Sequence, residues 1–106
     1  MKLLFKSSNA ETLRSAIIKM IEDKDLKTWT ITTSESVKYL KHTQQWGDKG
    51  VVKLKADNTK GYLSAEVLRF KGVIDDIKDF EGYYLGRFCE IIFVNFPGRF
   101  TSIEKE

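Results

Sequence analysis

The first third of the chain changes from a strand-like to a helix-like pattern of apolar positions. Leu3 and Phe5 alternate with their neighbours, and this period of two predicts a short strand. The spacing then becomes three and four, which predicts a helix over about residues 9–23 with one apolar face. That face consists of Leu13, Ala16, Ile17, Met20 and Ile21. Ser8 and Glu11 have the spacing of a capping box, so we expect the helix to begin there.

The middle of the chain predicts four strands in two hairpins. The segments "KTWTITT" and "VKYLKHT" are rich in β-branched and aromatic residues and flank "SES", a turn-like tripeptide. A short helix from Ser34 is the alternative for the second segment, but its apolar face would be narrow. The segments "VVKLKA" and "GYLSAEVLRFK" flank "DNTKG", whose composition is typical of a hairpin with a glycine bulge. Alternation is expected to place Leu63, Ala65 and Val67 on one side of the sheet.

The aromatic stretch "FEGYYLGRFCEIIFVNFPG" combines two overlapping signals. Its apolar positions step by three or four along Ile77, Phe80, Tyr84, Phe88 and Ile91. These steps favour one long helix over about residues 75–95, with an acidic first turn and "PG" at its end. A shorter helix followed by a strand at residues 89–96 stays open, because a short apolar run fits either structure. Gly82 and Gly86 each weaken a helix interior, but they share a face where the missing side chains permit close packing against another element.

The order of these elements predicts an α+β fold. Consecutive strands in the middle favour an antiparallel sheet, and two helices packed on one face would complete a two-layer sandwich. We therefore expect a mainly antiparallel sheet of about five strands, covered on one face by helices over residues 9–23 and 75–95. Phe100 and Ile103 indicate a short last strand or a docked tail. By its length the chain, residues 1–106, is expected to form a single domain.

Composition narrows the class of protein without naming a function. Hydrophobic residues make up 42% of the chain, which is enough for a packed core. The net charge of +3 permits a nucleic-acid partner without requiring one. The single cysteine cannot form an internal disulfide, and no apolar run has the length of a signal sequence or a membrane span. We expect an intracellular, cytoplasmic protein that does not interact with a membrane.

The residues that most often carry catalysis are sparse. Cys89 and His42 are the only thiol and imidazole, they lie 47 positions apart, and nothing local supports their pairing. In the predicted helix Cys89 falls in an apolar row, where it would behave as a small hydrophobic residue. A group of acids, Asp75, Asp76, Asp79 and Glu81, is explained by the helix dipole alone. We predict no catalytic residue, no metal site and no cofactor, and therefore a protein that is not an enzyme.

The strongest of the weak functional signals is basic charge in the middle of the chain. Between Lys27 and Lys71, lysine and arginine exceed aspartate and glutamate by five. Alternation places Lys53 and Lys55 on one face of their strand. Lysines on the outer face of a sheet commonly only keep it soluble, and we favour that interpretation. The residues predicted to bind a partner are Trp46, Lys38, His42, Lys53, Lys55 and Tyr62.

These observations predict a small non-catalytic binding module. The expected partner is another protein, with the chain acting as an inhibitor or accessory protein, or a second copy of itself. Trp46, in a glycine-flanked loop, is the preferred anchor if Trp29 points into the core, because tryptophan is enriched at binding hot spots. The alternative is binding of RNA or single-stranded DNA through a basic sheet face with exposed aromatic residues.

Overall fold

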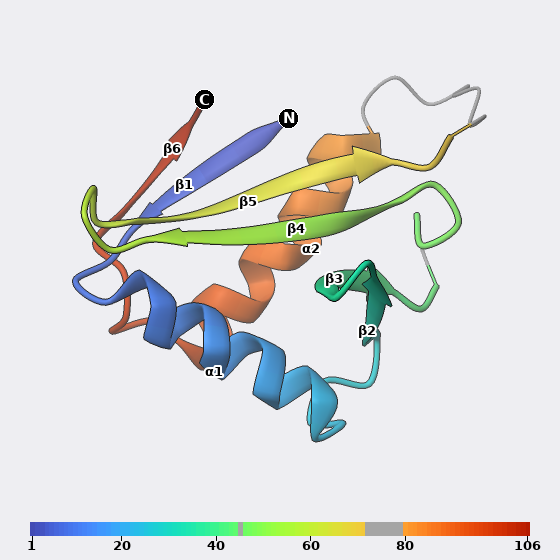
Figure 1. Cartoon of the computed structure of the whole chain (residues 1–106), viewed down its shortest axis with the longest axis horizontal. Coiled ribbons are helices and arrows are strands. Elements are labelled where there is room, and N and C mark those ends of the chain that lie inside the picture. The colour runs from blue at the N-terminus through green and yellow to red at the C-terminus, as the bar shows by residue number, and fades with distance from the viewer. Residues whose placement is uncertain (45, 72–79) are drawn as a thin grey trace.

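The structure, a computed structural model, describes residues 1–44, 46–71 and 80–106 (Figure 1). Its elements are β1 (Lys2–Lys6), α1 (Ala10–Glu22), β2 (Trp29–Ser34), β3 (Val37–His42), β4 (Gly50–Asp57), β5 (Tyr62–Arg69), α2 (Phe80–Asn95) and β6 (Ser102–Lys105). The strands form one antiparallel sheet in the order β2-β3-β4-β5-β1-β6. The predicted α+β class is confirmed. The sheet of the described residues has six strands rather than about five, because the tail pairs with β1 as β6.

The alternation of side chains along the last hairpin, predicted from the sequence, determines which residues lie on the buried face of the sheet. Leu63 and Ala65 of β5 are fully buried and lie in register with Phe5 and Leu3 of β1, respectively. Residues of this parity form one hydrophobic cluster with the buried faces of α1 and α2. The opposite parity, which includes Tyr62 of β5, faces away from the helices. We call this second side the open face of the sheet.

Both hairpins close with the backbone geometry that tight turns require. Glu35 and Ser36 connect β2 to β3 and have positive φ angles of 50° and 68°. These angles are typical of a two-residue hairpin turn whose backbone twist matches the right-handed twist of the two strands. This hairpin replaces the short helix considered as an alternative from Ser34. Between β4 and β5, Gly61 has a φ of 76° and donates its N–H to the Asp57 carbonyl at 2.8 Å. The predicted glycine-closed hairpin is therefore present.

The start of α1 differs from the predicted capping box. Asn9, not Ser8, caps the helix, because its Oδ1 accepts a hydrogen bond from the Thr12 N–H at 3.1 Å. The backbone N–H of Glu11 donates to Oδ1 of Asn58 at 3.0 Å. Asn58 belongs to the loop between β4 and β5. The capping box predicted that the Glu11 N–H would be satisfied by Ser8, but a residue distant in sequence accepts this hydrogen bond instead.

The second helix resolves the ambiguity of the aromatic stretch. Helix α2 continues to Asn95, so the alternative of a strand at residues 89–96 is wrong. Residues 75–79 of the predicted helix, including Asp75, Asp76 and Asp79, lie outside the described residues. Within the described residues, no other element packs closely against the two glycines, so the space that they leave is open. Apart from the chain neighbours and the adjacent backbone of α2 itself, a Cβ at Gly86 would meet no described atom within 4 Å, and one at Gly82 would meet only the Met1 side chain at 3.9 Å.

Aromatic side chains from the sheet and α2 form the centre of the core. The ring of Phe88 lies 5.7 Å from that of Phe5 and 6.4 Å from that of Trp29. Trp29 is buried, so it is a core residue and leaves Trp46 as the tryptophan available for binding. Neither helix in the described part of the chain has the length and apolar character needed to cross a membrane.

Candidate functional site

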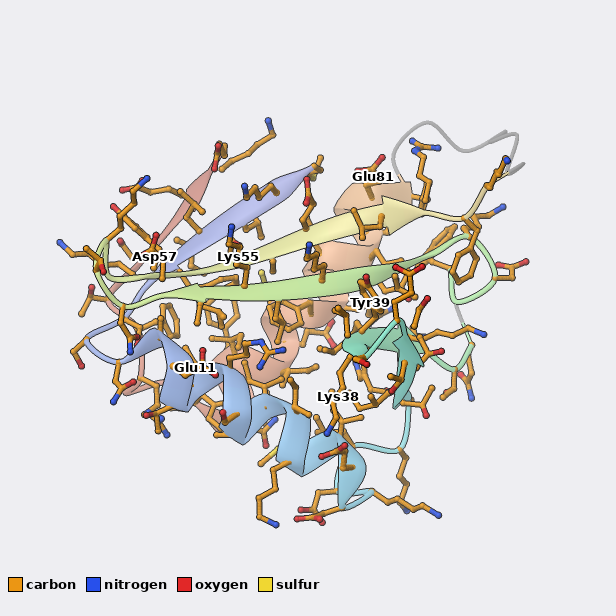
Figure 2. All side chains as sticks on the ribbon, viewed as in Figure 1. Glu11, Lys38, Tyr39, Lys55, Asp57 and Glu81 are labelled. Carbon is orange, nitrogen blue, oxygen red and sulfur yellow. The ribbon has the colours of Figure 1, made fainter. Side chains whose placement is uncertain are left out.

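The structure does not bring the six predicted partner-binding residues together. Lys53, Lys55 and Tyr62 lie on the open face of the sheet. Lys38 and His42 belong to the helix-facing side of β3, and Trp46 lies in the loop that follows β3. Figure 2 shows this division, with Lys55 directed away from α1 and Lys38 close to the end of α1. The prediction therefore covers three separate regions, each with its own environment.

Lys38 is engaged within the chain. Its Nζ donates to the Glu22 carboxylate of α1 at 2.7 Å, and both side chains stay partly exposed. An ion pair of this kind contributes only about 0–1 kcal/mol to stability. Its main consequence is positional, because it connects the outer part of the sheet to the last turn of α1.

His42 is buried, and its ring makes contacts within the chain. Only 5% of its surface is accessible, its ring packs edge-on against Trp29 at 5.1 Å, and its Nδ1 accepts the Gln44 N–H at 3.2 Å. A small hollow of about 300 Å³ beside it is also lined by Arg87 and Glu90. Cys89 is not among the described residues that line this hollow.

Tyr84 explains why His42 occupies this position. The phenol of Tyr84 is fully buried, accepts the His42 backbone N–H at 3.0 Å and donates to the Gly50 carbonyl at 2.9 Å. It bridges β3 and β4 where the two strands diverge, since Leu40 and Val52 form their paired position. Burial raises the pKa of Tyr84, which keeps the phenol protonated as a donor. Sequence spacing contains no signal for this contact between α2 and two strands.

Charges on the open face of the sheet are mixed. Glu66 of β5 lies in register with Lys2 of β1 on one side and with Lys53 of β4 on the other. Tyr62 lies in register with Asp57. An open hollow of about 400 Å³ on this face is lined by three lysines and two acids. Opposite charges in neighbouring strands attract one another, so the basic excess counted along the sequence does not become a uniformly positive surface.

The outward side of α2 is unusual because it exposes large apolar side chains on both sides of a charged pair, Arg87 and Glu90. Tyr83 is 56% exposed, Phe93 55% and Val94 76%, although all three are large hydrophobic residues. The outer side of a helix in a two-layer fold is normally polar. The sequence signal for this surface is that residues 80–95 have almost no polar face. The apolar rows of this segment predict core packing, and that prediction makes no use of this signal.

Trp46 belongs to the same surface. Its ring stacks on that of Tyr83 with 5.3 Å between centroids and 10° between planes. Near the other end of the helix, the ring centroid of Phe100 lies 5.9 Å from that of Phe93. We define the α2 outer face as Trp46, Tyr83, Arg87, Glu90, Phe93 and Val94. Trp46 is the one predicted binding residue that belongs to this face.

Glu81 is the member of the predicted acidic group that the structure describes. Its carboxylate accepts hydrogen bonds from the Met1 ammonium at 2.6 Å and from Arg69 Nε at 2.8 Å. Burial alone would raise the pKa of Glu81, but these two cations outweigh it and lower the pKa. Within residues 1–44, 46–71 and 80–106, no group of three or more His, Cys, Asp or Glu side chains could hold a metal ion.

Cys89 is expected to react slowly with thiol reagents. It is half-buried beside the core, and burial raises the pKa of its thiol, which lowers the fraction of reactive thiolate. We expect the native protein to be labelled severalfold more slowly at neutral pH than the same protein in denaturant. Following the label by mass spectrometry tests this, and equal rates in both conditions would show an accessible thiol.

Comparison with known proteins adds no identification. No protein-family model, no curated protein and no solved structure matched this chain. The candidate site is therefore assigned from its own residues, and the α2 outer face is the surface whose exposure most needs an explanation.

Proposed function

We propose that the chain is a small non-catalytic module that functions by binding another protein molecule through the α2 outer face. The observation that carries this proposal is the exposure of Tyr83, Phe93 and Val94 on one side of one helix. Large apolar side chains exposed together on one side of an element commonly mark an interaction site, and here they flank the charged pair Arg87 and Glu90. Stacked Trp46 and Tyr83 supply the aromatic residue types that are enriched at binding hot spots.

RNA or single-stranded DNA binding is the second candidate. Lys53, Lys55 and Tyr62 share the open face of the sheet, so a cation and an aromatic ring are available for phosphate and base. The acids Glu66 and Asp57, in register with Lys53 and Tyr62, lower the positive potential of the same surface. This mixed charge favours a protein partner over a polyanion.

A reducing compartment fits this function. Cys89 is the single cysteine of the chain and is free, so the fold contains no disulfide that an oxidising environment would need to form. We propose that the protein acts in the cytoplasm. Fractionation of the source cell with an antibody against the protein tests the location, and recovery outside the cytoplasmic fraction would contradict it.

Replacing Val94 by aspartate is expected to weaken partner binding at least about tenfold, because it places a charge in a desolvated interface. The measurement is retention of the partner, a different protein or a second copy, by immobilised wild type and variant. The control is Lys53→Glu with Lys55→Glu, which alters the open face and should leave retention unchanged. The opposite result, with loss only in the lysine variant, would move the binding surface to the sheet.

The nucleic-acid candidate has a separate test. Fluorescence anisotropy with a labelled mixed-sequence oligonucleotide at low salt is expected to show little binding. Tight binding that falls steeply with salt, and that is lost in the variant with Lys53→Glu and Lys55→Glu, would replace the protein-binding proposal, because such salt dependence reports release of phosphate counterions.

A further inference from the structure

We infer that the α2 outer face is the interface of a homodimer, in which two copies of α2 pack antiparallel about a two-fold axis near residue 88. This inference rests on the proposed function and names the partner as a second copy of the chain. The charges and the side-chain sizes along α2 are complementary to the same helix turned end for end. Such self-complementarity is what a two-fold interface requires of a single surface.

The outward side of α2 contains two parallel rows of residues. The tyrosine row is Tyr83, Arg87, Glu90 and Val94, and the glycine row is Gly82, Gly86, Cys89 and Phe93. Both rows have steps of four, three and four residues, which keep side chains along one stripe of a helix. This spacing reads the same from either end. A reversed copy of the helix therefore meets each row position by position.

Charge is complementary in the tyrosine row. When the row is reversed against itself, Arg87 lies opposite Glu90 of the second copy, and Tyr83 lies opposite Val94. Arg87 already contacts Glu90 of its own helix at 2.9 Å, so two such pairs would form a four-charge cluster across the axis. A parallel arrangement would instead place Arg87 opposite Arg87. Like charges across an interface are strongly unfavourable, which selects the antiparallel pairing.

Size is complementary in the glycine row. Reversal places Gly82 opposite Phe93 of the second copy and Gly86 opposite Cys89. Apart from the chain neighbours and the adjacent backbone of α2, no described atom lies within 4 Å of where a Cβ at Gly86 would stand. The large, exposed Phe93 ring thus meets a position without a side chain, and each helix can approach closely at both ends. The glycines, which cost about 1 kcal/mol each in a helix interior, gain a structural reason.

The expected dimer is weak to moderate. One helix pair, widened by Trp46 stacked on Tyr83, is smaller than the interfaces of permanent dimers, so we expect a dissociation constant in the micromolar range. Sedimentation equilibrium over a dilution series should show the mass rise from the monomer value of 12.3 kDa towards twice that value. A constant monomer mass at every concentration would overturn the inference.

Charge reversal identifies the interface. Arg87→Glu alone and Glu90→Arg alone should each raise the dissociation constant at least about tenfold, because like charges then face each other in the homodimer. An equimolar mixture of the two variants should associate again, since every cation meets an anion in the mixed dimer. Lys55→Glu, on the open face, is the control and should dimerise normally. If the wild type dimerises but Arg87→Glu does so equally well, the dimer uses another surface and the inference is wrong.

Cross-linking tests the orientation. In a Cys89→Ala background, Tyr83→Cys and Val94→Cys are prepared as separate proteins and oxidised with diamide, alone and mixed. An antiparallel dimer gives a disulfide only in the mixture, whereas a parallel dimer links each variant to itself and contradicts the inference. Failure of self-association leaves the proposed function intact if Val94→Asp still abolishes retention of a different protein. Retention that is unaffected by Val94→Asp contradicts the proposed function separately.

Discussion

Replacing Phe88 by alanine is expected to lower the free energy of unfolding by about 3–5 kcal/mol, the range for deleting a fully buried aromatic side chain. Phe88 has no accessible surface and packs edge-on against Phe5 of β1 and Trp29 of β2. Its ring therefore joins strands that lie far apart in the sheet order. Alanine would remove these contacts and leave a cavity that surrounding rings cannot fill. Urea unfolding followed by circular dichroism measures the loss.

The matched control lies on the other side of the same helix. Phe93→Ala removes the same group from a residue that is 55% exposed and contacts Phe100, so we expect a loss of less than about 1 kcal/mol. The comparison is made at concentrations below those of the proposed dimer. Similar losses for both variants would mean that Phe93 is buried in the monomer, which would contradict the exposure on which the α2 outer face depends.

The periodicity of apolar positions predicts most of the fold because it depends on local geometry. Alternation correctly places Leu63, Ala65 and Val67 on the buried side of β5, and steps of three and four locate both helices. Hairpin chemistry is equally local, as Gly61 shows with its positive φ. These predictions require no knowledge of which elements meet in space.

The errors arise where distant segments decide local structure. The capping of α1 involves Asn58, which stands 47 residues beyond the Glu11 amide that it accepts from. The sixth strand exists because the tail pairs with β1, with the Thr101 N–H donating to Lys6 and the Glu106 N–H to Lys2. No periodicity in a four-residue segment can specify such a pairing.

The candidate site is harder to predict than the fold. Residue chemistry selects Lys38 and His42 as partner-binding residues, and in the structure Lys38 pairs with Glu22 of α1 while His42 is buried beside Trp29, so neither belongs to the α2 outer face. Conversely, the apolar rows of α2 point to core packing and give no reason to single out Val94 as a partner-facing residue. A helix that exposes large apolar side chains beside its few charges calls for a second surface to cover them, and that imbalance is the available signal.

Removing one oxygen atom from Tyr84 should test how the two layers are joined. Tyr84→Phe is expected to destabilise the protein by about 2–4 kcal/mol, because two buried backbone groups, the His42 N–H and the Gly50 carbonyl, lose their partner at about 1–3 kcal/mol each. The ring itself is retained, so little packing is lost. Thermal and urea unfolding of wild type and variant give the difference.

Tyr83→Phe is the control, because Tyr83 is 56% exposed and the same change there should cost less than about 0.5 kcal/mol.

The pH dependence of stability gives an independent check. Since burial raises the pKa of Tyr84 in the folded state, its contribution is complete below the unfolded value of about 10 and declines as the pH rises through the folded value. Tyr84→Phe should therefore remove the part of the stability loss at alkaline pH that comes from this phenol, and Tyr83→Phe should keep it. Equal stability of Tyr84→Phe and wild type would show that the hydrogen bonds of the phenol are not needed to hold β3 and β4 in position where the strands separate.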